Sequence, residues 1–220
     1  MGGLWRVMAR ESSYLSLVPD FATAVKRAHR LLKEEEIKRL PVDPFQIARN
    51  RGWGPIPYYY NESPDSSLKY GFIMPNEDGD YKIYFNEYAK NEEQKRWTIA
   101  HEIGHMVLHI GKYDFSQIHK DEKLYGKLEV EAHYFAAELL APMALLKIMG
   151  VTRTHEIASV CEINLDAAAK REEQIRKCSH FPVFKRARWW MRLQFDEYLQ
   201  PLGFRKENLM REILDPWQSG

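Results

Sequence analysis

The sequence predicts an α+β protein, because helical segments occupy both ends of the chain and short strands lie between them. Apolar residues recur at intervals of three and four in the helical segments, whereas the middle has short runs rich in aromatic and β-branched residues. The strands follow one another without intervening helices. This order favours a small, mainly antiparallel sheet beside helices over a parallel α/β sheet.

Two helices are predicted before the sheet. The first spans about 20–39 and starts at an aspartate that can serve as its N-cap. The second has Asp43 as its N-cap, Pro44 at the first helical position and Gln46 as the partner of a capping box. Gly52 is expected to end this helix in the left-handed conformation.

Three strands are predicted at 56–60, 68–74 and 81–86, separated by clusters of Pro, Asn, Asp and Gly. Asp78-Gly79 lies between the last two strands and is a favourable hairpin turn. These two strands are therefore expected to be neighbours in the sheet.

Helices are predicted from the last strand to the end of the chain. Asn91 can cap a long helix that runs to about Ile110. A polar segment, 112–125, is predicted to be a loop that either covers the site as a lid or serves as a plain connection. Another helix spans 126–141, and shorter helices follow it.

Composition excludes several function classes. Of the 220 residues, 45% are hydrophobic and 29% charged, and the formal net charge is +1. The chain can therefore bury a core and has no global field that would recruit nucleic acid or anionic lipid. Two cysteines outside any CxxC pair fit a reducing compartment. No uninterrupted apolar run approaches the roughly 18 residues of a membrane span, so we expect a cytoplasmic protein without membrane insertion.

The chemistry is expected at the motif His101-Glu102-Ile103-Gly104-His105. Side chains four residues apart on a helix lie about 40° apart around its axis and about 6 Å apart along it. Both imidazoles can therefore bind one Zn²⁺. Glu102 follows the first histidine and can reach a water at the metal without being a ligand. The alternative is a buried helix with two structural histidines.

A catalytic zinc site needs a third protein ligand, and the helix at 126–141 offers carboxylates. Its predicted apolar face consists of Leu128, Ala132, Phe135, Ala136, Leu139 and Leu140. Glu129 lies at the edge of this face, where a carboxylate needs a partner, and is the preferred third ligand. Glu131 is the weaker candidate. Together with Glu138 it lies on the opposite shoulder, where the two are predicted to form a solvated pair.

Two further histidines lie near these candidates. His109 continues the i+4 series, but it lies about 12 Å along the axis from His101. It is therefore predicted to pack nearby or to support a ligand. His133 lies one turn beyond Glu129 and is either a hydrogen-bond partner of a ligand or a surface residue. The candidate donors to an oxyanion are Tyr113, His119, Tyr125 and His133.

The chain resembles the ImmA/IrrE-type zinc metallopeptidases over roughly residues 20–175. The resemblance is carried by the order and spacing of Leu40-Pro41-Val42-Asp43-Pro44 with Ile47-Ala48, Tyr70–Ile73, Arg96–His109 and Glu129–Pro142. The chain departs from the usual family pattern at Trp97, Ala141 and His133, where Phe, Met, and Asn or Asp are usual.

The resemblance implies a zincin-like metallopeptidase core in which His101, His105 and Glu129 bind zinc and Glu102 is the general base. It also implies an endopeptidase that cleaves a regulatory protein, such as a helix-turn-helix repressor. Such proteins act in phage, mobile-element or stress-response circuits.

The expected organisation is an N-terminal extension at 1–19, a metallopeptidase domain at 20–150 and a helical C-terminal region at 151–220. Within that last region, residues 176–192 carry six Lys or Arg and no acid, interleaved with four aromatic residues. We interpret this basic stretch as a solvated helix face with an apolar underside, dispensable for zinc binding. Direct nucleic-acid binding is less favoured.

A second function competes with the endopeptidase. In this alternative the chain is a non-proteolytic, zinc-containing regulator that binds DNA or a protein through its helical tail. Glu102 favours the enzyme, because a structural zinc site has no use for a general base.

Overall fold

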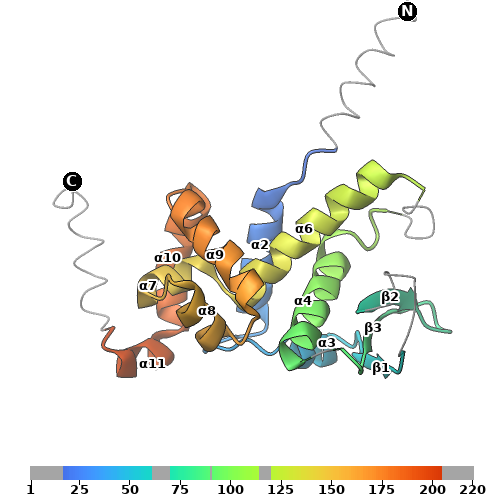
Figure 1. The fold of residues 1–220 in the computed structure, drawn as a ribbon, viewed down its shortest axis with the longest axis horizontal. Coiled ribbons are helices and arrows are strands. Elements are labelled where there is room, and N and C mark those ends of the chain that lie inside the picture. The colour runs from blue at the N-terminus through green and yellow to red at the C-terminus, as the bar shows by residue number, and fades with distance from the viewer. Residues whose placement is uncertain (1–16, 61–69, 90, 114–119, 205–220) are drawn as a thin grey trace, which may run out of the picture.

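The computed structural model describes residues 17–60, 70–89, 91–113 and 120–204, and the predicted α+β fold is confirmed. The elements in chain order are α2 (Phe21–Glu34), α3 (Pro44–Asn50), β1 (Ile56–Tyr58), β2 (Gly71–Pro75), β3 (Tyr81–Asn86), α4 (Glu92–Leu108), α6 (Glu122–Leu140), α7 (Met143–Met149), α8 (Thr154–Cys161), α9 (Leu165–Cys178), α10 (Pro182–Gln194), α11 (Asp196–Leu199) and the short 3₁₀ helix η2 (Gln200–Leu202). Helices α2, α4 and α6 lie in the middle, with the sheet beyond α4 and the C-terminal helices on the other side (Figure 1).

The sheet has the strand order β1-β3-β2, so the last strand lies in the middle. Strands β2 and β3 pair antiparallel, from Gly71 opposite Phe85 to Pro75 opposite Tyr81. Gly79 lies in the turn between them with φ +84°, a conformation that favours glycine. The predicted hairpin is therefore confirmed, whereas β1 pairs parallel with β3.

Helices α4 and α6 cross at a close contact that depends on small residues. A Cβ atom added at Gly104 would lie 3.1 Å from both Cα and the carbonyl oxygen of Ala132, and 3.2 Å from Cδ1 of Phe135. Glycine on one helix and alanine on the other therefore let the two backbones approach. This contact sets the distance between the histidines of α4 and the glutamates of α6.

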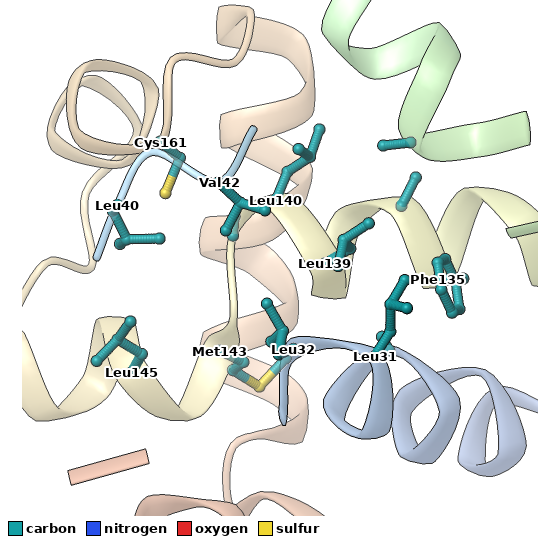
Figure 2. Close-up of a cluster of buried hydrophobic side chains, with 14 of the residues drawn as sticks. Leu31, Leu32, Leu40, Val42, Phe135, Leu139, Leu140, Met143, Leu145 and Cys161 are labelled. Carbon is teal, nitrogen blue, oxygen red and sulfur yellow. The ribbon is translucent and has the colours of Figure 1, made fainter. Parts of the chain in front are cut away.

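One hydrophobic core joins the middle helices to the C-terminal ones. Figure 2 shows Leu32 of α2, Leu139 of α6, Met143 of α7 and Cys161 of α8 in the same cluster, and all four are fully buried. The helices after residue 150 therefore pack on the same core as the elements that carry the HEIGH motif.

The basic stretch forms most of α10 and has the apolar underside that was expected. The core-facing residues of this helix are Phe184, Ala187 and Met191. Gln194, its last residue, donates hydrogen bonds to the carbonyl oxygens of Leu32 at 2.8 Å and Ile37 at 2.6 Å. This packing indicates that the stretch contributes to the fold, since its removal would expose the core beside α2 and α7, and its dispensability for zinc binding stays a prediction.

Two helix boundaries differ from the prediction. The helix expected over 20–39 ends at Glu34, and Glu36 has φ +49°. Three consecutive glutamates stand at this end, where the helix dipole disfavours negative charge. Helix α6 begins at Glu122, four residues early, because the side chain of Asp121 accepts two backbone N–H groups of its first turn.

The helical run Glu122–Met149 is long and apolar enough to cross a membrane by length and hydropathy. It comprises α6 and α7, and 72% of its most apolar window is buried inside the fold. The sequence prediction considered only uninterrupted apolar runs and so did not single it out. Its apolar character is accounted for by packing, because core helices of folded domains pass the same test.

Candidate metal centre

Helix α4 brings the two histidines of the HEIGH motif together. The helix starts at Asn91, whose side chain accepts the backbone N–H of Gln94 at 2.8 Å. Ile99 and Ile103 are buried in the core, which fixes the rotation of the helix about its axis. As a result, Nε2 of His101 and Nε2 of His105 lie 3.1 Å apart.

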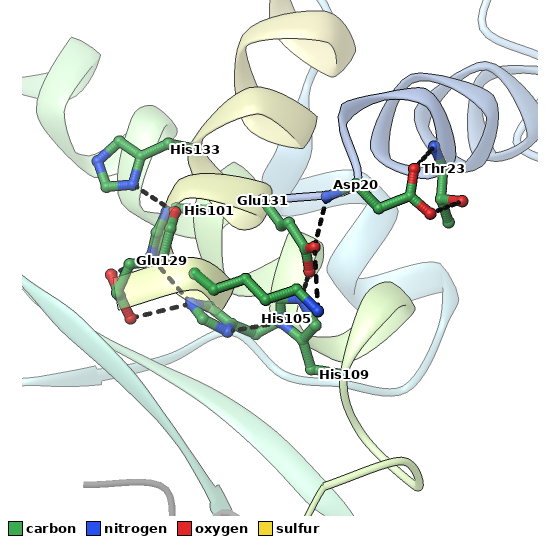
Figure 3. A network of polar contacts seen from close by, with 9 residues as sticks. Asp20, Thr23, His101, His105, His109, Glu129, Glu131 and His133 are labelled. Carbon is green, nitrogen blue, oxygen red and sulfur yellow. Dashed lines mark hydrogen bonds and ion pairs between the residues drawn. The ribbon is translucent and has the colours of Figure 1, made fainter. Parts of the chain in front are cut away.

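Helix α6 brings Glu129 to both of these nitrogen atoms (Figure 3). Oε2 of Glu129 lies 3.2 Å from Nε2 of His101, and Oε1 lies 3.3 Å from Nε2 of His105. Ligand atoms at about 2.0–2.1 Å from a tetrahedral zinc are about 3.3 Å from one another. Two imidazoles and one carboxylate at these separations therefore fit a zinc ion.

The electrostatics of Glu129 also suit a ligand. Burial acts to raise the pKa of this carboxyl, but its contacts with His101 and His105 outweigh burial and lower the pKa well below its usual range. The carboxylate form is the one that binds metal.

Glu102 lies beside this donor set and is only 8% exposed. Burial raises the pKa of its carboxyl to about 7, an effect that His101 opposes and the charge of Glu129 reinforces. Strand β2 passes close by: a Cβ atom at Gly71 would lie 2.5 Å from Cγ2 of Thr98 and 3.8 Å from Cγ of Glu102. A carboxyl group with a pKa raised to near neutrality, beside a candidate metal-binding donor set, has the properties expected of a general base.

His133 contacts one of the candidate ligands. Its Nδ1 lies 2.9 Å from the backbone oxygen of Glu129, and the centroid of its ring lies 4.4 Å from that of His101. His101, Glu129 and His133 also offer ligand atoms that all lie within 4.8 Å of one another. The set with His105 is tighter and matches tetrahedral zinc more closely.

Two tyrosines have a pKa that is raised by burial and by the nearby glutamates of the site. Burial, followed by the carboxylate of Glu129, raises the pKa of Tyr125 to about 12. Burial, followed by Glu102, raises the pKa of Tyr58 to about 12. Sequence reasoning considered Tyr125 and missed Tyr58, because β1 precedes the motif by more than 40 residues. Residues 114–119 of the predicted lid, His119 among them, lie outside the described residues.

His109 lies behind His105, one turn further along α4. Its Nδ1 is 3.0 Å from Nδ1 of His105, and its Nε2 is 3.0 Å from Oε2 of Glu131 (Figure 3). The ring of Tyr113, another candidate donor, lies 6.1 Å from that of His109. Burial, with the nearby His105, lowers the pKa of His109 to about 3. This histidine therefore stands outside the donor set and contacts one of its members.

The prediction of a solvated pair at Glu131 and Glu138 is wrong. Glu131 is 7% exposed and Glu138 is fully buried. Helix α2 covers this shoulder of α6: the backbone N–H of Asp20 donates to Glu131 at 2.7 Å, and Nε2 of His29 lies 2.7 Å from Glu138. Apolar periodicity shows which face of a helix meets the core, but not which polar groups a second helix brings to its flank.

An α+β fold in which an HExxH helix crosses a glutamate-bearing helix defines a class, the zincin-like metallopeptidases. The family model for the IrrE N-terminal-like domain, a peptidase family, matches residues 62–172, which is half of the chain. The chain belongs to this family, and the resemblance seen in the sequence is confirmed. The matched span contains α4 and α6, whereas α2 and α10 lie outside it. A search of curated proteins finds no match to the chain.

Proposed function

We propose that this protein is a zinc-dependent endopeptidase with His101, His105 and Glu129 as the zinc ligands and Glu102 as the general base. The observation that carries the proposal is the convergence of three side chains, those of His101, His105 and Glu129, with contacts of 3.1–3.3 Å between each pair, beside a buried carboxyl group. Membership in a peptidase family supports hydrolysis of a peptide bond. The nitrogen and oxygen donors support zinc over magnesium or calcium, which prefer oxygen ligands.

The residues of the chain have distinct tasks in this mechanism. Zinc at such a site supplies Lewis-acid chemistry that polarises a carbonyl and activates a water. Glu102 accepts the proton of the attacking water on a carboxylate oxygen and then donates it to the leaving amine nitrogen. Tyr125 and Tyr58 keep their protons near neutral pH, because the pKa of each is raised to about 12. They are the hydroxyl donors we propose for the carbonyl oxygen.

The proposed substrate is a regulatory protein of the helix-turn-helix repressor type, cleaved in the cytoplasm. The family resemblance supports this substrate class. The formal net charge of +1 also favours a protein partner over DNA, because the chain has no strong positive field.

Co-expression with a helix-turn-helix repressor tests the proposal, and any small repressor encoded beside the gene would be the first partner to try. The wild-type chain should shorten that protein and activate a reporter fused to its target promoter. Glu102→Gln should do neither and should still bind about one zinc per chain, because the substitution keeps shape but removes the base. Loss of a general base typically lowers the rate by about 10²–10⁴-fold.

Glu92→Gln is the matched control. It makes the same change on the same helix, at an exposed position that pairs with Lys95 at 3.0 Å, and it should cleave like the wild type. If Glu102→Gln activates the reporter while the partner stays full length in both strains, proteolysis is not the function. The non-proteolytic zinc regulator would then be the better account.

A further inference from the structure

A continuous chain of contacts runs from the donor set to helix α2. Nδ1 of His105 lies 3.0 Å from Nδ1 of His109, and Nε2 of His109 lies 3.0 Å from Oε2 of Glu131. The other carboxylate oxygen of Glu131 accepts the backbone N–H of Asp20 at 2.7 Å. His109 is 1% exposed and Glu131 is 7% exposed, so water competes little for these contacts. Figure 3 shows how the residues follow one another.

The chemistry of these groups determines which atom donates the hydrogen in each of the contacts. A carboxylate only accepts hydrogen bonds, so the hydrogen between Glu131 and His109 belongs to Nε2 of His109. In the neutral ring the other nitrogen, Nδ1, is then an acceptor. The hydrogen between the two rings must therefore belong to Nδ1 of His105, and the lone pair of His105 is on Nε2, the atom that faces Glu129.

We propose that Glu131 and His109 are positioning residues that hold His105 in the tautomer with its lone pair on Nε2. This proposal rests on the proposed role of His105 as a zinc ligand. Metal-binding histidines commonly donate their second ring N–H to a carboxylate or carbonyl, which orients the ring and makes it a better ligand. Here a second histidine is inserted between the ligand and the carboxylate.

The groups that contact the carboxylate of Glu131 are hydrogen-bond donors, so its oxygen atoms act as acceptors. Besides the N–H of Asp20, Nζ of Lys127 lies 3.8 Å from Oε1, and both are donors. Asp20 is the N-cap of α2, and its own carboxylate accepts the N–H of Thr23 at 2.9 Å. The start of α2, which lies outside the span matched by the family model, therefore orients Glu131. This residue is the far end of the relay that runs from His105 through His109 to Glu131.

The two histidines of the motif differ in this respect. Nδ1 of His101 is buried and makes no hydrogen bond to any group in the described part of the chain, whereas Nδ1 of His105 contacts His109. Loss of the relay should therefore act on His105 directly and reach His101 only through the 3.1 Å contact between the two Nε2 atoms.

The first measurement is the tautomer itself, read from imidazole ¹⁵N shifts and couplings of the metal-free protein. The wild type should show His105 with its hydrogen on Nδ1. His109→Phe should give a mixture of tautomers at His105. His109→Gln should retain the wild-type signature, because its amide oxygen can accept from His105 while its NH₂ group donates to Glu131.

The second measurement is zinc affinity by competition with a chromophoric chelator. His109→Phe and Glu131→Ala should bind zinc about 10–100-fold more weakly, and His109→Gln should lose less. His29→Phe is the matched control, since it removes another buried histidine that contacts a glutamate of α6, Glu138, at 2.7 Å. This control should lower stability but leave the zinc affinity of the folded protein unchanged.

The outcomes separate this proposal from the proposed function. A wild-type protein with the hydrogen of His105 on Nε2 would overturn the relay. So would a His109→Phe variant with wild-type zinc affinity and an unchanged tautomer. A wild-type protein that shows the expected tautomer but neither binds zinc nor cleaves the co-expressed repressor would support the series of hydrogen bonds from His105 to Glu131. That result would overturn the proposal of a zinc endopeptidase and, with it, the proposed role of these hydrogen bonds in holding a zinc ligand.

Discussion

Nη1 of Arg171 lies 3.1 Å from Oε2 of Glu138, and both side chains are almost completely buried. The other carboxylate oxygen of Glu138 lies 2.7 Å from Nε2 of His29 and accepts the backbone N–H of Met143 at 3.3 Å. These contacts join α9, α2 and the start of α7 to α6, the helix that carries Glu129. A buried ion pair therefore connects the C-terminal helix α9 to α6, the helix that contributes Glu129 to the candidate site.

Arg171→Met should destabilise the protein by about 3–5 kcal/mol, because it leaves the buried carboxylate without its cation. The double variant Arg171→Met/Glu138→Gln should recover part of this loss. Urea denaturation measures both values. Lys177→Met is the control on the same helix: its partner Glu173 is exposed, so the change should stay within about 1 kcal/mol. A loss of similar size at the two positions would contradict the buried ion pair.

This network is also where sequence reasoning failed. Glu131 and Glu138 lie off the apolar stripe of α6, and a stripe alone marks them as solvent-facing. Their partners, Asp20 and His29, are more than 100 residues away in the chain. A usable signal did exist, since His29 adjoins Ala28 on the apolar face of its own helix, where a polar group needs a partner.

Local features were predicted well because their causes lie within a few residues. The caps at Asp43 and Asn91, the hairpin at Gly79 and the helical placement of the HEIGH motif each depend on short-range hydrogen bonds or backbone conformation. The nearness of Tyr58 to the site depends instead on how the sheet docks on α4, which no local pattern encodes.

Gly104→Ala should lower both stability and zinc affinity. The new methyl group would meet the backbone of Ala132 at 3.1 Å, and a backbone cannot rotate away as a side chain can. Separation of α4 from α6 would move Glu129 from the two histidines, and overpacking typically costs about 1–3 kcal/mol. Thermal unfolding and chelator competition measure the two effects.

Gly126→Ala is the control for this prediction. Gly126 lies in α6, and a Cβ atom there would meet nothing within 4 Å. Alanine should therefore stabilise the helix by up to about 1 kcal/mol with unchanged zinc affinity. If both glycine variants gain stability, the helix crossing is not as tight as described.

Deletion of α10 and the residues after it should abolish cooperative unfolding of the remaining chain. Truncation after Ser179 removes Phe184 and Met191 from the core and the two hydrogen bonds of Gln194. By contrast, Lys185→Gln with Arg188→Gln changes only exposed positions of the same helix and should leave the melting temperature unchanged. A truncated chain that stays folded and binds zinc would show that the basic stretch is an appendage after all.

Glu129→Ala should reduce the zinc content of the purified protein to near zero, because two histidines alone hold the ion weakly. His133→Asn should retain about one zinc per chain if the donor set with His105 is the correct one. Elemental analysis of the two variants distinguishes the donor sets. Loss of zinc from the His133 variant alone would favour the set formed by His101, Glu129 and His133.

The last prediction concerns the stability of the metal-free protein as a function of pH. Burial raises the pKa of Glu102 from 4.5 to about 7, so the folded state holds this proton more tightly than the unfolded state. Between these two pH values the native protein binds more protons than the unfolded chain, and the free energy of unfolding must fall as pH rises. The shift corresponds to a loss on the order of 3 kcal/mol. His109, whose pKa is lowered to about 3, gives the opposite slope up to about pH 6.5 and would mask the effect in the wild type alone.

The difference between the wild type and Glu102→Gln removes that interference, because His109 is present in both proteins. Urea denaturation in the presence of a chelator, at several pH values from 4 to 8, gives this difference directly. The wild type should lose stability relative to the variant as pH rises from about 4.5 to 7, and the difference should level off above that range. A difference that stays constant, or that grows in favour of the wild type, would mean that Glu102 is ionised at ordinary pH in the folded chain. Its carboxylate would then be a weaker base than the mechanism assigns to it, since a general base works best with a pKa near the working pH.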